Sequence, residues 1–221
     1  MINSIKITFF VFALVIFGQA HLSRADTPLN IVMLGDSLTA GYGLDPQDAL
    51  PEQITRALRS DAGINVRIIN QGLSGDTSAG GLLRLQTALD LQPDGLILAL
   101  GSNDALRGLP VAITYENLDQ IMSTAAQLDI PVLLVGAKAP NNWGPSYQQE
   151  FDNMYVQLSQ QHDATLYPFI LEGVALNDKF NQPDMMHPNK QGVQVIVKKL
   201  APVVRDFIEK HLKNTFKEQN E

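Results

Sequence analysis

The stretch IVMLGDSLTAGYGL, residues 31–44, begins as an apolar run and then turns polar and rich in glycine. The change comes at Asp36 and Ser37, directly after the apolar run. A continuous run of large apolar residues is typical of a strand that is covered on both faces, as in a parallel sheet. Open α/β sheets bind ligands beyond the carboxyl ends of their strands. The stretch therefore predicts a parallel α/β sheet and makes Ser37 a candidate nucleophile.

Apolar runs of strand length alternate with segments of helical period along the rest of the chain. Strands are expected at LNIVMLG (29–35), NVRIINQG (65–72), DGLILALG (94–101) and PVLLVGA (131–137), with a weaker one near TLYPFI (165–170). Helices are expected at 48–63, 77–93, 111–131, 146–163 and 189–216. This alternation predicts a three-layer α/β/α sandwich with a parallel central sheet. Pro202 is expected to kink or divide the last helix.

The first 25 residues differ from the rest of the chain. Lys6 precedes an uncharged apolar run over residues 7–17, which is shorter than the about 20 residues of a membrane-spanning helix. This pattern predicts a signal peptide, residues 1–25, with cleavage after Ala20 or Ala25; Ala25 is preferred because the folded pattern starts soon after it. The alternatives are a retained membrane anchor and a buried first strand.

The remaining chain is long enough for one ordinary core, because it belongs to a sequence of 221 residues of which 45% are hydrophobic. We expect one domain over residues 26–213, followed by a flexible tail, 214–221. The sequence has no cysteine, so it carries neither a disulfide nor a lipid-modified cysteine.

Charge limits the possible partners. Loss of residues 1–25 removes two of the 16 basic residues and none of the 23 acidic ones, which leaves a formal charge of −9. A chain this acidic, whose one short run of basic residues lies around Lys198, Lys199 and Arg205, is not expected to bind nucleic acid. We expect a periplasmic or secreted protein with no membrane span after cleavage, no obligate protein partner, no cofactor and no metal.

Polar residues follow three of the expected strands. Asp36 and Ser37 follow the first strand, and the segments NQGLSGD and ALGSND carry the other two sets. Because the carboxyl ends of parallel strands meet at one edge of the sheet, these residues are expected to converge. A fourth segment, QPDMMHPN, lies just before the last helix and carries Asp184 and His187.

These four segments meet the needs of nucleophilic acyl transfer. Such chemistry requires a hydroxyl, a base, a carboxylate that orients the base, and hydrogen-bond donors for the oxyanion. Ser37 supplies the hydroxyl, His187 the base and Asp184 the carboxylate. The side-chain amide of Asn103 and the backbone N–H groups of Gly75 and Ser37 are the candidate donors.

His187 is selected among four histidines by its surroundings. Asp184 stands three residues before it, and Pro188 directly after it ends the turn and opens a helix. One other histidine lies in the expected signal peptide, and we expect His162 and His211 to be structural or simply solvated.

Three further aspartates, Asp36, Asp76 and Asp104, adjoin the candidate residues. We expect them to cap helices or tie loops together through backbone N–H groups. The alternative is a divalent-metal site in a phosphohydrolase, although no tight cluster such as DxD is present.

The blocks GDSLTAGYG, GLSGDTSAGG, GSND and DMMHP resemble the four blocks of the SGNH (GDSL) hydrolases, in the same order, between residues 31 and 188. The chain is most similar to the exported bacterial arylesterase, thioesterase and lysophospholipase branch. This resemblance implies a flavodoxin-like α/β/α fold. It also implies Ser37 as nucleophile, Gly75 and Asn103 as oxyanion donors, and Asp184 with His187 as the rest of the triad.

The sequence departs from that family pattern at two places. Ser102 stands where members of the branch often have a second glycine, and Met185 and Met186 are bulkier than expected between acid and base. No glycine stands two residues before Ser37, so the GxSxG elbow of the α/β-hydrolases is not present.

These observations predict a serine hydrolase acting on a small acyl ester or thioester, a class that includes lipids. The alternatives are an acyltransferase or carbohydrate deacetylase on the same fold, and a non-catalytic periplasmic binding protein. An apolar acyl groove is expected from Leu106, Leu109, Trp143, Tyr147, Met185 and Met186. Alternatively, Trp143 and Tyr147 only pack their loop.

Overall fold

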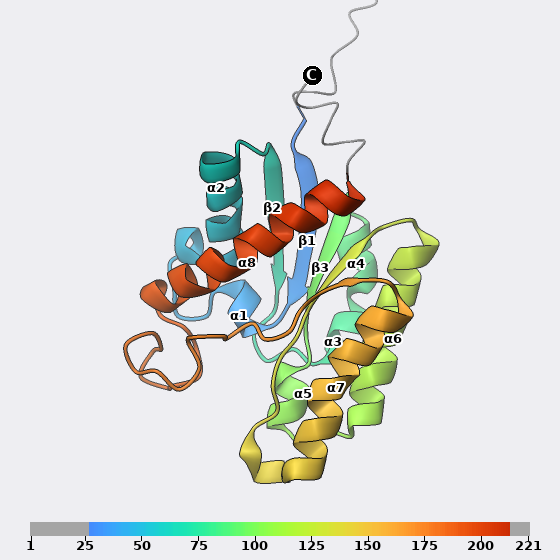
Figure 1. Ribbon diagram of the computed structural model, residues 1–221, viewed down its shortest axis with the longest axis vertical. Helices are drawn as coiled ribbons and strands as arrows, with labels where there is room; N and C mark the ends of the chain where they lie inside the picture. Colours follow the sequence, from blue (N-terminus) through green and yellow to red (C-terminus); the bar gives the residue numbers. More distant parts are fainter. Residues whose placement is uncertain (1–26, 213–221) are drawn as a thin grey trace, which may run out of the picture.

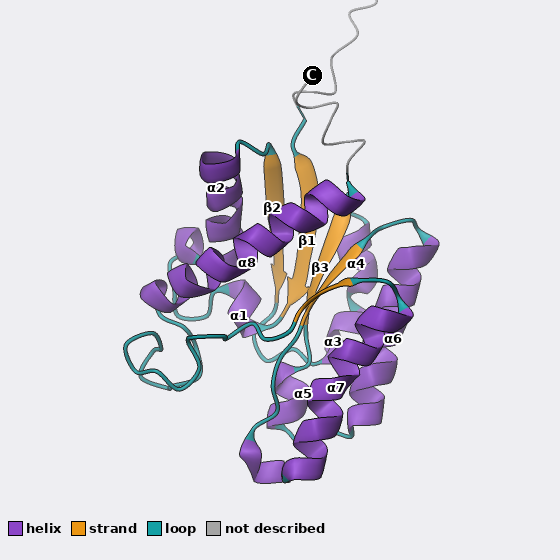
Figure 2. Cartoon of the chain, viewed as in Figure 1, coloured by secondary structure: helices purple, strands orange, loops and turns teal. Residues whose placement is uncertain are grey.

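A five-stranded sheet forms the centre of the molecule (Figures 1 and 2). This computed structural model describes residues 27–212 of the chain. The strands are β1 (Leu29–Gly35), β2 (Val66–Gly72), β3 (Gly95–Ala99), β4 (Val132–Val135) and β5 (Thr165–Tyr167). Their order across the sheet is β2-β1-β3-β4-β5, and every neighbouring pair is parallel. The predicted parallel α/β architecture is confirmed.

Helices cover both faces of this sheet. They are α1 (Ser37–Ala40), α2 (Leu50–Ala62), α3 (Ser78–Leu83), α4 (Leu85–Leu89), α5 (Ser102–Leu106), α6 (Val111–Gln127), α7 (Pro145–Gln161) and α8 (Lys190–His211), with short 3-10 helices η2 (Pro46–Asp48) and η3 (Asn141–Trp143). Ile31 and Met33 pack with α2 and α8 on one face, whereas Val32 and Leu34 pack with α4, α6 and α7 on the other. Figure 1 shows α8 crossing the sheet on the first of these faces. Alternating side chains of β1 thus pack into two apolar layers, one on each face of the sheet.

Two helices differ from the sequence prediction. The segment 77–93 forms two short helices that meet at Arg84, whose guanidinium reaches the carbonyl oxygens of Gln71 and Gly35 and the carboxylate of Asp76. The helix breaks where this side chain is drawn towards the sheet.

The last helix is not divided at Pro202. Helix α8 continues from Lys190 to His211, and Pro202 lies on its exposed side. A proline removes one backbone donor. At an exposed position water can satisfy the carbonyl that loses its partner, so the helix tolerates the ring.

The expected signal peptide, 1–25, and the expected tail, 214–221, lie outside the described residues. Within residues 27–212, no helix has both the length and the apolar character needed to cross a membrane.

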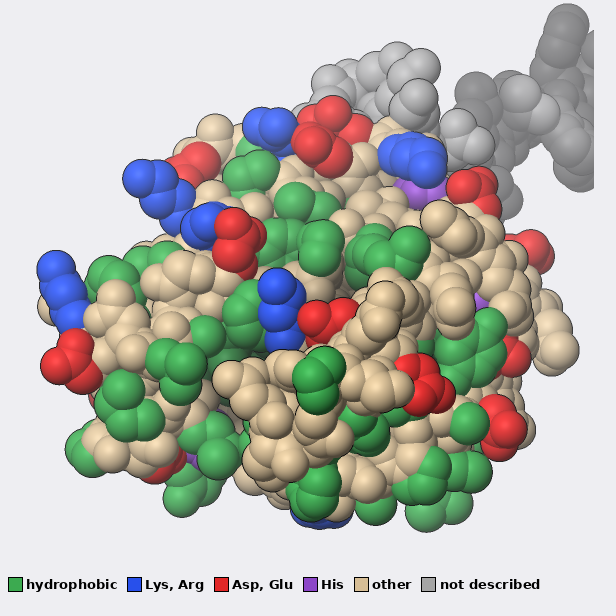
Figure 3. All heavy atoms as spheres, turned by 60° about the horizontal axis from the view of Figure 1, so that its bottom comes forward, with side chains coloured by type: hydrophobic (Ala, Val, Ile, Leu, Met, Phe, Trp, Pro, Cys, Tyr) green, Lys and Arg blue, Asp and Glu red, His purple; other side chains and the backbone are tan. Residues whose placement is uncertain are grey.

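The order of the strands fixes where a site can form. Strand β1 is hydrogen-bonded to β2 on one side and to β3 on the other, so the chain reverses its direction of winding between β1 and β3. At such a switch point the loops after the two strands diverge and leave a crevice. Figure 3 turns the bottom of Figure 1, where the strands end, towards the viewer, and hydrophobic side chains are spread over this face among charged ones.

Candidate active site

The loop after β1 presents Ser37 at the start of α1. Asp36 caps this helix, because its carboxylate oxygen Oδ1 accepts a hydrogen bond from the Leu38 N–H at 3.0 Å. Only 2% of Asp36 is exposed, and its carbonyl oxygen also accepts from the Ala40 N–H at 2.9 Å. Ser37 is therefore held on a short helical turn that is anchored in the interior.

Asp184 and His187 lie on a loop that precedes α8. Asp184 Oδ1 accepts from the N–H groups of Met186 and His187, at 2.9 and 3.0 Å. Its Oδ2 lies 2.7 Å from His187 Nδ1. The hydrogen bond from the His187 N–H, followed by those from the His187 ring and the Met186 N–H, lowers the pKa of Asp184 to about 2. The carboxylate is consequently ionised at neutral pH.

Ser37 and His187 meet although 150 positions separate them. His187 Nε2 lies 2.9 Å from Ser37 Oγ, so hydroxyl, imidazole and the Asp184 carboxylate form one continuous hydrogen-bonded row. The Tyr42 ring packs against the imidazole, with the ring centroids 4.5 Å apart. The arrangement has the geometry needed for an imidazole to take a proton from a hydroxyl.

Gly75 and Asn103 approach the same point from the loops after β2 and β3. Gly75 has φ +82°, in a turn that is closed by a hydrogen bond from the Asp76 N–H to the Leu73 carbonyl. This left-handed conformation explains the glycine. Asn103 is the second residue of α5, and both residues line the pocket onto which Ser37 and His187 open. The structure thus brings together all five residues selected from the sequence, with Asp184 behind the imidazole.

Asp76 and Asp104 have structural partners; Asp104 binds a backbone N–H as expected, whereas Asp76 binds a guanidinium. Asp76 forms an ion pair with Arg84 at 2.6 Å. Asp104 accepts from the backbone N–H and the hydroxyl of Ser78, at 2.8 and 2.6 Å, and so ties α5 to α3. Within residues 27–212, no group of three or more histidine and acidic side chains is arranged to hold a metal ion.

Asp36 differs from these two because it lies beside the site and titrates near neutrality. Burial raises its pKa to about 6, against the opposing effects of the Leu38 N–H and of a hydrogen bond from the Ser102 side chain. The amide nitrogen Nδ2 of Asn103 lies 3.5 Å from Oδ2 of Asp36. Ser102, the departure from the family pattern, therefore supplies a donor to this buried carboxyl group.

A largely apolar pocket of about 440 Å³ extends from Ser37. Its apolar wall is formed by Leu38, Tyr42, Leu106, Phe169, Ile170, Leu171 and Met186. Leu106 and Met186 were predicted, whereas the segment 169–171 was missed. That segment begins two residues after the last residue of β5, beyond the carboxyl end of the strand, as at the other strand ends. Strand β5 is only three residues long, so its sequence signal is weak.

The predicted contribution of Trp143 and Tyr147 to this pocket is wrong. Trp143 Nε1 donates to the Ala105 carbonyl at 2.7 Å, and its indole ring covers Gly108. The Tyr147 hydroxyl donates to the Leu109 carbonyl at 2.9 Å, while its partly buried ring packs against the core. Both side chains contact the segment between α5 and α6 and so pack loops, which was the alternative left open. Neither Leu109 nor Met185 is among the lining residues.

Two other histidines lie away from the pocket. His162 Nε2 is 2.6 Å from Asp119 Oδ1, and His211 Nε2 is 3.4 Å from the Thr165 hydroxyl. Burial lowers the pKa of His211, which favours the neutral ring. Their expected structural character agrees with these contacts.

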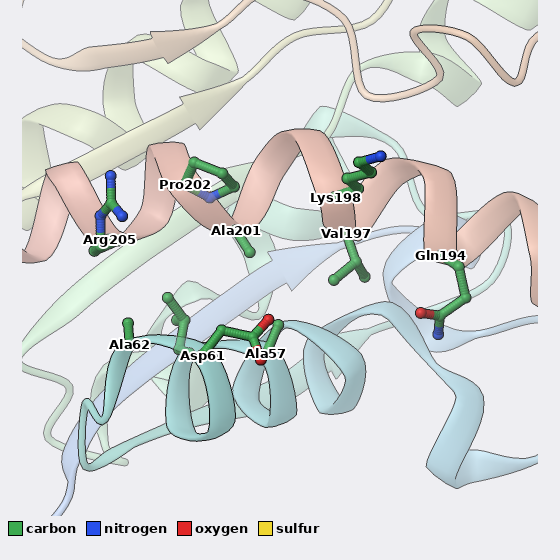
Figure 4. A pocket seen from close by; sticks show the side chains of 10 residues that line it. Ala57, Asp61, Ala62, Gln194, Val197, Lys198, Ala201, Pro202 and Arg205 are labelled. Carbon is green, nitrogen blue, oxygen red and sulfur yellow. The ribbon is translucent and has the colours of Figure 1, made fainter.

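A second pocket, of about 450 Å³, lies between α2 and α8 (Figure 4). Ala57 and Val197 contribute to its apolar part, and Asp61, Lys198 and Arg205 are its charged residues. It contains neither a hydroxyl nor an imidazole side chain, so it offers no equivalent of the Ser37 and His187 pair.

Comparison with known proteins gives concordant results. A model of the GDSL-like lipase/acylhydrolase family matches residues 33–195. Esterase TesA of Pseudomonas aeruginosa is 34% identical over 188 residues, which cover 85% of this chain and 93% of that protein. Thioesterase 1/protease 1/lysophospholipase L1 of Escherichia coli is 34% identical over 186 residues, covering 82% of this chain and 88% of its own. The solved structure of AlinE4, an SGNH-hydrolase family esterase, superposes with a TM-score of 0.69 at 44% identity and covers 82% of this chain and 97% of that chain.

Proposed function

Because the chain belongs to the GDSL-like lipase/acylhydrolase family, we propose that it is a serine hydrolase that cleaves carboxylic esters or thioesters. The observation that carries the proposal is the row of hydrogen bonds from Ser37 Oγ through His187 to Asp184, at 2.9 and 2.7 Å, at one end of an apolar pocket. A solvated surface serine has no such base beside it.

In the first step His187 Nε2 takes the proton of Ser37 as Oγ attacks the acyl carbonyl carbon. Asp184, bonded to Nδ1, stabilises the imidazolium that forms and keeps Nε2 directed at the hydroxyl. The imidazolium then protonates the leaving oxygen or sulfur, and the acyl group stays on Ser37. In the second step His187 activates water, which releases the acid and restores the serine.

The negative oxygen of the tetrahedral intermediate needs fixed donors. The N–H of Ser37 begins α1 and so has no acceptor within that helix, the Gly75 N–H is unobstructed by a side chain, and the Asn103 amide carries two N–H groups. We assign these three groups to the oxyanion. Donors of this kind act most strongly in a site that excludes water.

The substrate we propose carries an apolar acyl chain. Phe169, Ile170 and Leu171 form one side of the pocket, and Leu106 and Met186 add further apolar surface. Pockets of several hundred Å³ with few polar groups are typical of sites for small apolar ligands. The relatives named esterase and thioesterase/lysophospholipase support an acyl ester or thioester as the class of substrate.

We also propose that the protein is exported to the periplasm or secreted. The basis is the apolar run over residues 7–17, with possible cleavage sites after Ala20 and Ala25. Strand β1 starts at Leu29, four residues beyond the preferred site. The mass of the protein recovered from a periplasmic fraction tests the proposal and distinguishes the two sites. A full-length chain that stays in the membrane fraction would contradict it.

The test of the activity uses the purified protein and its Ser37→Ala variant. Both are incubated with p-nitrophenyl esters from acetate to palmitate, and hydrolysis rates are recorded. We expect turnover that depends on acyl length, and a loss of about 10⁴-fold or more in the variant.

Two controls define the outcome. The thermal unfolding midpoint of the variant establishes that it is folded, and products are analysed with and without an added alcohol to detect acyl transfer. Turnover that survives in folded Ser37→Ala would refute the serine mechanism. An ester product in place of the free acid would make the enzyme an acyltransferase.

A further inference from the structure

The site is assembled from two segments that are held separately. Ser37 belongs to the turn after β1, whereas His187 belongs to the loop before α8. The hydrogen bonds of Asp184 are all made within its own loop, with Met186 and His187, so they shape the loop but do not fix its distance from Ser37. The bond between His187 and Ser37 and the Tyr42 ring join the two segments at the imidazole. A further contact joins them outside it.

We propose that Gln182 is the positioning residue that holds the base loop, residues 183–189, against the nucleophile segment, residues 36–43. Its side-chain nitrogen Nε2 donates to the Tyr42 carbonyl at 2.7 Å and to the Pro188 carbonyl at 3.0 Å. The first of these bonds joins residues that are 140 positions apart. An amide NH₂ has two hydrogens, and both are used here, one towards each segment.

The backbone of Gln182 ties the same residue to the loop. Its N–H donates to the His187 carbonyl at 2.7 Å, and its carbonyl accepts from the Met185 N–H at 2.9 Å. With the bond to the Pro188 carbonyl, Gln182 therefore contacts the loop on both sides of the imidazole. A displacement of its side chain would be transmitted to His187.

The nucleophile segment is shaped to receive this amide. Gly43 has φ +72°, and a Cβ at this position would overlap the Gln182 amide oxygen Oε1 and would lie 3.0 Å from its Cδ and 3.1 Å from its Nε2. A side chain at residue 43 would push the amide away from the Tyr42 carbonyl. The close approach and the left-handed backbone both call for glycine.

Tyr42 contacts both Gln182 and the imidazole of His187. Its carbonyl is held by Gln182, and its ring lies against His187 with 4.5 Å between the centroids. One amide thus holds both the loop that carries the base and the backbone of the residue whose ring packs on it.

Gln182 does not line the pocket. Its loss should therefore leave the binding of substrate in place and slow the chemical step, because catalysis depends more steeply on geometry than binding does. The inference rests on the proposed esterase function, since its readout is the rate of ester hydrolysis.

The test compares Gln182→Met and Gln182→Glu with the unchanged protein on the best p-nitrophenyl ester. Methionine keeps the length of the side chain and removes both donors. Glutamate keeps the shape, but its ionised carboxylate faces two carbonyl oxygens. We expect kcat to fall by about 10- to 100-fold in Gln182→Met and at least as far in Gln182→Glu, with KM little changed.

The matched control is Gln194→Met on α8, where the amide donates to the Gln53 side chain at 2.7 Å, away from the site. We expect this variant to keep its kcat. Active enzyme is counted by stoichiometric reaction with an organophosphate, so that kcat refers to folded sites; if Gln182→Met does not fold, Gln182→Glu decides. A kcat per active site equal to that of the unchanged protein, or a change in KM alone, would overturn the inference. Absence of hydrolysis by the unchanged protein would instead contradict the proposed function.

Discussion

Asp36 and Asp184 both lie next to the proposed nucleophile and base, but in opposite environments. Asp36 is buried at the end of β1, with 2% of its surface exposed, and its pKa is raised to about 6. The side chain of Asp184 is 41% exposed on a loop, and its pKa is lowered to about 2. Burial away from water is the main cause of the raised pKa of Asp36, whereas hydrogen bonds to the ionised form are the main cause of the lowered pKa of Asp184.

The difference shows two ways of fixing a side chain. The nucleophile segment is fixed by packing, because it continues from a strand that is paired on both sides. The base loop is fixed by directed hydrogen bonds, because little of it is buried. Apart from Ser37 itself, changes in the first region should therefore act mainly on stability, whereas the loss of His187 in the second region should act mainly on activity.

The substitution His187→Ala has the largest expected effect and tests whether the base loop serves activity and not stability. We expect kcat/KM to fall by about 10⁴-fold or more, since the proton of Ser37 then has no acceptor. The free energy of unfolding should change by less than about 1 kcal/mol, because the loop contributes little to the core. Ester hydrolysis and urea unfolding check the two statements. A large loss of stability would mean that the base loop supports the fold.

The next effect concerns Asn103, which connects the buried carboxyl group to the pocket. Replacement by alanine removes one proposed oxyanion donor and should lower kcat by about 100- to 1,000-fold. Steady-state kinetics measures this loss, with Asn117→Ala as a control because Asn117 donates to the Ser78 hydroxyl outside the pocket. A change in KM alone would assign Asn103 to substrate binding.

Asp36→Asn tests the buried region through its pH dependence. A carboxyl group whose pKa is raised on folding stabilises the fold below its unfolded pKa of 3.8, and this contribution is lost as the pH rises through about 6. At about 1.4 kcal/mol per pKa unit, the full contribution is about 3 kcal/mol, of which the unchanged protein should lose about 2 kcal/mol between pH 4 and 7 that the asparagine variant keeps. Urea unfolding at several pH values measures the difference, and parallel curves for the two proteins would refute it.

Asp184 should behave with the opposite sign. A carboxyl group whose pKa is lowered on folding stabilises the fold above its unfolded pKa of 3.8, and the contribution is lost as the pH falls towards 2. The free energy of unfolding of the unchanged protein and of Asp184→Asn is measured in urea at several pH values. The difference between the two should be constant above about pH 5 and should shrink as the pH falls from about 4 to 2.

The smallest expected effect is at Met185, whose φ of +58° is unusual for a residue with a side chain. The left-handed conformation costs about 1–2 kcal/mol for such a residue, and glycine adds about 0.5–1 kcal/mol of backbone entropy. Met185→Gly should therefore stabilise the fold by up to about 1 kcal/mol. Urea unfolding measures the gain; a loss would mean that the Met185 side chain packs favourably on the loop.

The sequence predicted the sheet and the convergence of its strand ends because both follow from local patterns. Continuous apolar runs mark β1 and β3, and polar residues follow each run directly. The orientation of Trp143 could not be predicted, since it depends on the path of the loop after β4. Sequence reasoning treats an aromatic residue near a strand end as a candidate for the pocket, but here the ring packs over Gly108.

Gln182 illustrates a second limit of sequence reasoning. Glutamine is common in loops, and its main partner, the Tyr42 carbonyl, is a backbone atom 140 positions away. Nothing about the identity of Tyr42 or Gln182 signals this contact. It becomes visible only when the chain is folded.

The 150 positions that separate Ser37 from His187 have a consequence for how the protein is made. A polypeptide leaves the ribosome from its N-terminus, so the serine emerges early and the imidazole arrives only with the last part of the fold. Incomplete chains therefore carry a hydroxyl without a base. A newly made molecule gains its hydrolytic activity only when its synthesis is nearly finished.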